Sequence, residues 1–147
     1  MGGHPWFYYV DYEPDINAAL QKLRQREFLA GRYNPAMDFP EFPVDENSPG
    51  IGAQHGSIEE AIEDADADGT RSILDMMEVS DTPDYNVVAP LSSEKLLELF
   101  GTDKPTFEMI EESEELYDEL ERGKGVYIIA YKDGQPSKIL FAGYSFD

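Results

Sequence analysis

The chain has 147 residues, the size of one ordinary domain, and 41% of them are hydrophobic and 12% aromatic, which predicts a folded protein. Its 31 acids against 11 bases give a formal net charge of −20, which excludes electrostatic attraction to nucleic-acid phosphates or to an anionic membrane. The absence of cysteine excludes a disulfide framework, a thiolate metal site and a cysteine nucleophile.

The first predicted elements are a strand and a helix. Residues 5–12, PWFYYVDY, are aromatic and β-branched, which is typical of a strand. Residues 14–30 have the apolar spacing of a helix, with Pro14 suited to its first turn and Gly31 to the position just past its end.

A long loop is predicted over residues 32–56. This segment contains four prolines, so neither a helix nor a central strand is expected there. Loops of this length are uncommon in compact domains and are often functional. We expect Phe39 and Phe42 to pin the loop to the core.

The same loop carries the best candidates for catalysis. Arg32 and Tyr33 begin it, and His55 lies near its end. If these side chains converge on one cleft, the imidazole and the phenol could act in acid–base catalysis and the guanidinium could hold an anion. The motifs of serine hydrolases, dinucleotide-binding folds and P-loops do not occur.

The middle of the chain predicts a helix followed by an internal strand. Ser57 and Glu60 have the spacing of a capping box, so a helix is expected over 58–66. The run RSILDMMEV at 71–79 carries apolar side chains on both faces, which is typical of a buried strand. A further short strand at 85–89 is an option.

The C-terminal third predicts two helices and a hairpin. Asp133-Gly134 is a strong signal for a tight turn between two strands. We therefore expect a single α+β domain, residues 1–147, with one mixed or mostly antiparallel sheet packed by helices. The predicted strands lie near residues 5–12, 71–79, 126–132 and 137–146, and the predicted helices near 14–30, 58–66, 92–100 and 105–122.

The stretch DADADGTRSILD, residues 64–75, resembles a calcium-binding loop. Its candidate metal ligands are Asp64, Asp66, Asp68 and Asp75. An EF-hand is rejected, because the preceding helix presents glutamates where apolar residues are needed and Arg71 occupies an apolar position of the loop. A lone acidic metal loop remains an alternative. The favoured interpretation is a helix end, a glycine turn at Gly69 and the strand at 71–79.

Acids at a helix C-terminus oppose the helix dipole, so this cluster needs an explanation. Solvation or pairing within the chain is the simplest one. A basic partner is the second, and the candidate binding residues are then Glu63, Asp64, Asp66 and Asp68.

Four segments are similar to those of a set of small, acidic, uncharacterised bacterial proteins. They are MGGHPWFYYV, AGRYNP, DGTRSILD and FAGYSFD, and the similarity covers nearly the whole chain. The resemblance implies a bacterial cytoplasmic protein, and it supplies no activity, cofactor or catalytic residue.

The composition and the missing motifs favour a non-enzymatic acidic binding protein. One concrete form is an inhibitor or immunity-type partner of a basic protein such as a toxin or nuclease. The alternative is a small enzyme with a site under the 32–56 loop that uses His55, Arg32 and Tyr33. We expect no cofactor, no nucleic acid, no membrane and a cytoplasmic location; the oligomeric state is left open.

Overall fold

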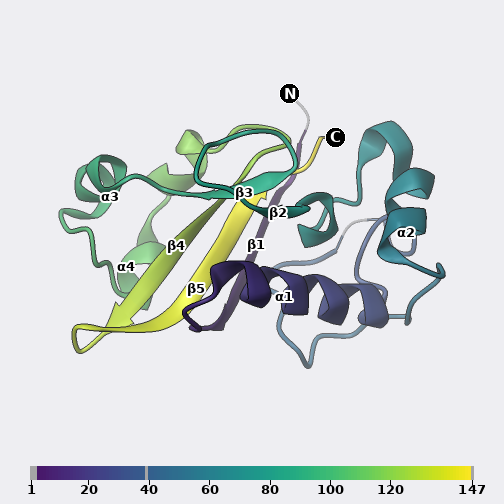
Figure 1. The fold of residues 1–147 in the computed structure, drawn as a ribbon, viewed down its shortest axis with the longest axis horizontal. Helices are drawn as coiled ribbons and strands as arrows, with labels where there is room; N and C mark the ends of the chain where they lie inside the picture. Colours follow the sequence, from purple (N-terminus) through teal and green to yellow (C-terminus); the bar gives the residue numbers. More distant parts are fainter. Residues whose placement is uncertain (1–2, 39, 147) are drawn as a thin grey trace.

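The computed structural model describes residues 3–38 and 40–146. Within these residues the chain forms a five-stranded sheet with helices on both faces (Figure 1). The strands are β1 (Pro5–Asp11), β2 (Glu78–Val79), β3 (Val87–Pro90), β4 (Gly125–Lys132) and β5 (Gln135–Tyr144). The helices are α1 (Ile16–Ala30), α2 (Ile58–Ala65), α3 (Ser93–Phe100) and α4 (Phe107–Glu112), and none of them is long and apolar enough to cross a membrane.

The strand order is β1–β5–β4–β3–β2. Strand β5 pairs antiparallel with β1 and β4, whereas β4, β3 and β2 run parallel to one another. The predicted α+β fold with a mixed sheet is therefore confirmed. Asp133 and Gly134, with φ values of 52° and 78°, join β4 to β5 with the backbone conformation that the hairpin signal predicts.

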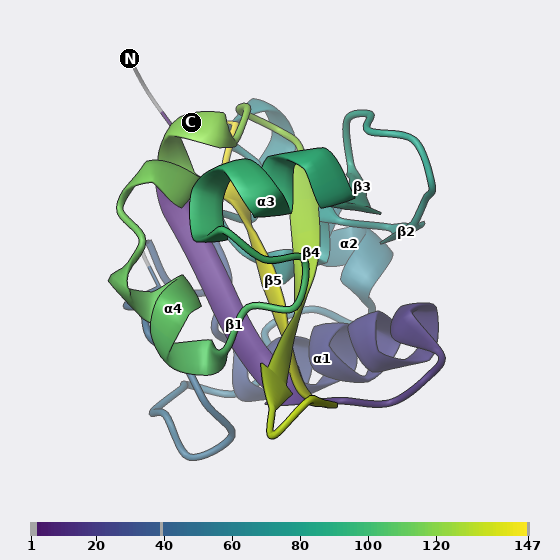
Figure 2. The same cartoon turned by 90° about the vertical axis from the view of Figure 1, so that its left-hand side faces the viewer.

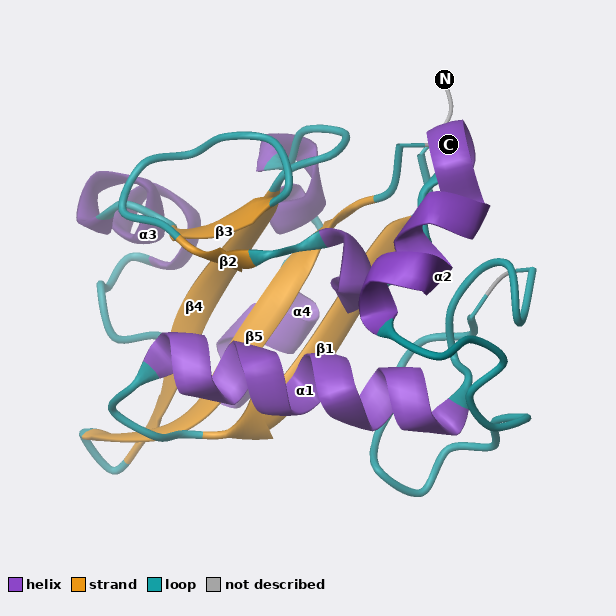
Figure 3. Ribbon diagram, turned by 45° about the vertical axis from the view of Figure 1, so that its right-hand side comes forward, coloured by secondary structure: helices purple, strands orange, loops and turns teal. Residues whose placement is uncertain are grey.

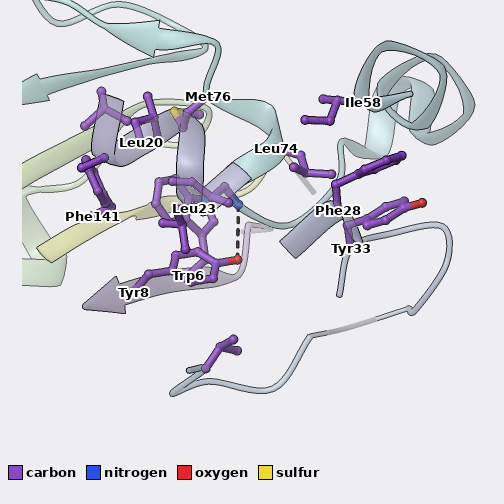
Figure 4. Close-up of a cluster of buried hydrophobic side chains, with 14 of the residues drawn as sticks. Trp6, Tyr8, Leu20, Leu23, Phe28, Tyr33, Ile58, Leu74, Met76 and Phe141 are labelled. Atoms are coloured by element: carbon purple, nitrogen blue, oxygen red, sulfur yellow. Dashed lines mark hydrogen bonds between the residues drawn. The ribbon is translucent and has the colours of Figure 1, made fainter. Parts of the chain in front are cut away.

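Each face of the sheet has its own hydrophobic core, because side chains alternate along the strands. Trp6 and Tyr8 of β1 pack on the face covered by α1 and α2, and Phe7 and Tyr9 pack on the opposite face. Figures 2 and 3 show α1 and α4 on opposite sides of the sheet. The α1 core also contains Leu20, Leu23, Leu74, Met76 and Phe141, which Figure 4 shows.

Helix α1 begins two residues later than Pro14 suggested. Asp15 is its N-cap, and its side chain accepts a hydrogen bond from the amide of Ala18 at 3.0 Å. Pro14 therefore precedes the cap. Gly31 ends the helix in the left-handed conformation, with φ 75°, as predicted.

The strand predicted at 71–79 is wrong over most of its length, since only Glu78–Val79 is a strand. A 3-10 helix occupies Ile73–Asp75 instead, because the hydroxyl of Ser72 accepts a hydrogen bond from the amide of Leu74 at 3.2 Å. Such local bonds between side chain and backbone compete with strand pairing. Ile73, Leu74 and Met76 are buried as expected, whereas Met77 is exposed. The buried side chains belong to a turn, and apolar spacing over so few residues does not distinguish a turn from a strand.

The single helix predicted over 105–122 is also wrong. Helix α4 ends at Glu112, and a separate 3-10 helix follows at Glu115–Glu119. The hydroxyl of Ser113 accepts a hydrogen bond from the amide of Leu116 at 3.3 Å and so starts the second helix. Both segments nevertheless contribute apolar side chains to the second core: Phe107, Ile110, Tyr117 and Leu120.

Strand β2 lies at one edge of the sheet, and α1 covers its polar backbone. The side chain of Asn17 accepts a hydrogen bond from the amide of Val79 at 3.1 Å. The side chain of Gln21 donates one to the carbonyl of Met77 at 2.9 Å. Free peptide groups on an edge strand can pair with another chain. Two polar residues of α1 thus close this edge.

Two helix-ending glycines give a matched test of the packing at the end of α1. We expect Gly101→Ala to cost about 1–2 kcal/mol in the free energy of unfolding, because φ is 74° and nothing lies within 4 Å of the added carbon. Gly31→Ala should cost roughly 1–3 kcal/mol more, because the same carbon would lie 2.2 Å from the carbonyl oxygen of Gly52. Urea denaturation of both variants measures the difference, and equal losses would contradict the close contact between Gly31 and Gly52.

Candidate functional site

The buried carboxylate of Glu27 dominates the region between α1 and the 32–56 loop. Glu27 has 0% exposure. Arg32 donates to it from Nε at 2.7 Å and from Nη2 at 2.6 Å, and Arg26 donates from Nε at 2.7 Å. The hydrogen bonds to Glu27 raise the pKa of Arg32. Sequence reasoning missed Glu27, although an acid four residues after Leu23 lies on the apolar stripe, which signals a buried ion pair.

Arg32, a predicted site residue, is therefore turned toward Glu27. Its Nη1 donates to the carbonyl of Ser48, so one guanidinium group joins the end of α1 to the distant part of the loop. The amide of Gly52 also donates to the carbonyl of Ala30 at 2.9 Å. The long loop is thus fastened to the C-terminal end of α1.

The loop is also fixed on β1 by an aromatic contact. The ring of Phe42 lies 5.2 Å from that of Tyr8 and 5.7 Å from that of Phe7, measured between centroids. This confirms the anchoring predicted for Phe42. Phe39, for which the same role was predicted, lies outside the described residues.

A half-open depression of about 690 Å³ lies beneath the loop. Arg32 lines it, but neither Tyr33 nor His55 does. The three predicted catalytic side chains therefore do not share this depression. Its other lining residues are mostly apolar, among them Met37, Phe42, Pro43, Val44 and Ile51.

Tyr33 and His55 do meet, in a hydrogen-bonded chain that continues to Asp64. Tyr33 is buried and stacks on Phe28, with ring centroids 5.8 Å apart (Figure 4). Tyr33 Oη lies 2.8 Å from His55 Nδ1, and His55 Nε2 lies 2.9 Å from Asp64 Oδ2. Tyr33 Oη also accepts the amide of Gln54 at 3.2 Å. All groups are satisfied when Tyr33 donates to Nδ1 and the Nε2–H donates to Asp64.

The hydrogen bonds from Tyr33 and to Asp64 leave neither ring nitrogen of His55 free. A general base must reach the proton that it removes. A substrate would therefore have to displace Asp64, whose side chain is 63% exposed, or part His55 from the buried Tyr33. The part played by Asp64 was not visible in the sequence, because it depends on how α2 turns back past the end of the loop.

The four acids predicted to bind a partner lie together at the end of α2. They are Glu63, Asp64, Asp66 and Asp68, and all four are exposed. Asp64 bonds to His55, and Asp68 lies 3.9 Å from Arg71. Glu63 and Asp66 form no ion pair with any residue of segments 3–38 and 40–146. Helix α2 has no basic residue in its own last turn, so no side chain of the helix balances these acids at its negative end.

The candidate metal ligands are not gathered at one point. Asp75 is buried, whereas Asp64, Asp66 and Asp68 are exposed. In the part of the chain that the structure describes, no group of three or more His, Cys, Asp or Glu residues is placed to hold a metal ion. The stretch 64–75 thus forms two short 3-10 helices with a glycine turn between them.

Asp75 instead organises the turn that precedes it. Its Oδ1 accepts hydrogen bonds from the amide of Thr70 at 2.8 Å and from the hydroxyl of Thr70 at 2.9 Å. Its Oδ2 is buried and has no hydrogen-bond partner among the described residues. Burial raises the pKa of Asp75, against the opposing effects of the bonds from Thr70 and the charge of Arg24. Asp75 therefore acts in the structure of the turn.

The role of Glu27 can be measured against an exposed ion pair. We expect Glu27→Gln to lower the free energy of unfolding by about 3–5 kcal/mol, because it leaves the buried Arg32 without its counter-charge. Glu13→Gln removes an exposed pair with Lys22 and should cost about 0–1 kcal/mol. Chemical denaturation measures both, and similar losses would show that the Glu27 pair is no stronger than a surface pair.

Asp75 predicts a specific pH dependence. A carboxyl with a raised folded pKa stabilises the fold fully below its unfolded pKa of about 3.9, and this contribution is lost as pH rises through the folded pKa. The stability of Asp75→Asn relative to wild type should therefore increase between pH 4 and pH 7. The exposed Asp68→Asn variant is the control in denaturation at both pH values. Parallel curves for Asp75→Asn and wild type would contradict the prediction.

No family model, no curated protein and no solved structure matches the chain. The resemblance to small bacterial proteins therefore stays a prediction. What the chain does has to be inferred from its own contacts, burial and charge.

Proposed function

We propose that the protein is a non-enzymatic binding protein whose acidic surface receives a basic partner protein. The observation that carries the proposal is the end of α2, where Glu63 and Asp66 are exposed and form no ion pair within the described segments. Acids at this end of a helix cost about 0.3–1 kcal/mol each when exposed. A cationic surface placed against them would relieve that cost and would be attracted by the net charge of −20.

An inhibitor or immunity-type partner of a basic toxin or nuclease is the concrete form that we favour. Opposite electrostatic fields speed the association of two proteins and disfavour wrong partners. The same net charge disfavours nucleic acid and anionic membranes as partners. We also propose a cytoplasmic location, since a chain without cysteine suits a reducing compartment.

The alternative enzyme has less support. It requires His55, Tyr33 and Arg32 to converge, and only the first two are in contact. Arg32 is held by Glu27 and Ser48, so its guanidinium is committed to the fold. Both ring nitrogens of His55 are bonded as well. These contacts favour a structural role over a catalytic role for the three residues.

The acids at the end of α2 can be tested by charge reversal. The double variant Glu63→Lys/Asp66→Lys should lose at least about tenfold in affinity for a basic protein captured from the cells that produce the chain, because like charges then face each other. Glu46→Lys/Glu78→Lys is the matched control, since it makes the same change in net charge at two other exposed acids.

Capture is followed at low and at moderate salt, and affinity by calorimetry with the captured protein. Retention of a basic protein by wild type, weakened by salt, is the expected result. If wild type retains no basic protein at either salt, the proposed function is wrong. If both double variants bind as wild type does, the end of α2 is not the binding surface.

A further inference from the structure

Helix α3 presents apolar side chains that the fold does not bury. None of its residues is buried. Leu97 is 52% exposed, and Met109 on the neighbouring α4 is 37% exposed. Exposed apolar side chains mark a candidate surface for a partner where they gather: Met109 lines one depression together with Leu99 and Phe100, whereas Leu97 does not line it. The other large apolar residues of α3 are only half-buried against the second core: Leu96, Leu99 and Phe100.

A shallow depression of about 470 Å³ lies between these two helices, which Figure 2 shows on the same side of the sheet. Ser113, at which α4 ends, lines it. The break between α4 and the following 3-10 helix is thus part of its wall. We call it the α3–α4 depression; it is lined by Leu99, Phe100, Met109, Glu112, Ser113, Glu114 and Glu115.

The wall of this depression combines an apolar half with an uncompensated acidic half. Glu112, Glu114 and Glu115 form no ion pair with any residue of the described chain. Residues 93–119 hold ten acids and two bases, a net charge of −8. One of the two bases, Lys95, already pairs with Glu98 and Glu119, at 3.1 and 3.0 Å.

We propose that the α3–α4 depression receives an amphipathic basic segment of a partner protein. One apolar side chain of the segment packs against Leu99, Phe100 and Met109, and flanking Lys or Arg side chains pair with the acidic half. The inference rests on the proposed function in taking the partner to be basic, and it adds a second surface, separate from the end of α2, and the need for an apolar anchor.

Charge and shape together select this occupant. A purely cationic surface would leave the apolar half of the depression exposed to water, and a purely apolar segment would leave the glutamates without partners. A second copy of the chain is disfavoured, because it would bring its own net charge of −8 to the same place. The depression therefore fits a segment that is both basic and apolar.

A synthetic helical peptide with leucines on one face and lysines on the other is the probe. Two matched peptides carry serine in place of leucine and glutamate in place of lysine. We expect saturable shifts of the Met109 methyl signal in NMR titrations with the first peptide only. The methyl signal of Met77, which is 45% exposed and lies outside the depression, is the internal control.

Variants test the apolar half and the acidic half of the depression one at a time. Met109→Ser and Glu112→Gln/Glu115→Gln should each weaken peptide binding by roughly tenfold. Leu29→Ser, at a residue of α1 that is 64% exposed, is the control for lost apolar surface. Glu46→Gln/Glu78→Gln, at two exposed acids that lie outside the depression and away from the end of α2, is the control for lost charge.

The outcomes distinguish this proposal from the general one. If a basic protein is captured but the depression variants bind the peptide as wild type does, the docking proposal is wrong and the proposed function stands. Equal binding of the leucine and serine peptides would show charge alone at work and would also overturn it. So would shifts of the Met109 signal that follow the concentration of the protein without peptide, because the depression would then be an interface between copies.

Discussion

The carboxylate of Glu27 is the constraint on which the N-terminal half of the structure depends. A buried charge is costly unless paired, so Glu27 requires Arg32 and Arg26 in fixed positions. Arg32 is the first residue of the long loop, and its second contact, with Ser48, determines where the loop returns. Tyr33, the next residue, is thereby placed beside His55. The path of an otherwise irregular segment thus follows from one acid on the apolar face of α1.

Polar side chains arrange the centre of the molecule in the same way. Asn34 donates from its side chain to the carbonyl of Gly69 at 2.9 Å, and its amide bonds the carbonyl of Thr70 at 2.8 Å. Asp75 completes this turn through Thr70. The segment after α1 and the segment after α2 are therefore joined directly, although some 35 residues separate them. These hydrogen bonds hold the segment that directly follows the acids at the end of α2.

The elements with local signals could be predicted, and those decided by distant contacts could not. Asp133-Gly134 encodes its hairpin within two residues, and Gly31 encodes the end of α1. The errors at 71–79 and 105–122 arise because the hydroxyls of Ser72 and Ser113 bind nearby amides and override the apolar pattern. For the candidate site, convergence of Arg32, Tyr33 and His55 was only a condition of the enzyme hypothesis, and the structure meets it for Tyr33 and His55 alone. The partners of Arg32 and His55 were not predicted, because ion pairs carry no sequence spacing outside a helix.

The covered edge at β2 restricts how this protein can recognise another chain. Many partners bind by adding a strand to an open sheet, which relies on backbone groups and is tolerant of side-chain identity. Asn17 and Gln21 already occupy the polar groups beside β2, so that mode is closed there. A partner that binds at this edge must instead recognise the charge and shape of the side chains there. Substitution of Asn17 or Gln21 would expose backbone groups of this edge, and two copies of the protein could then pair through them and self-associate.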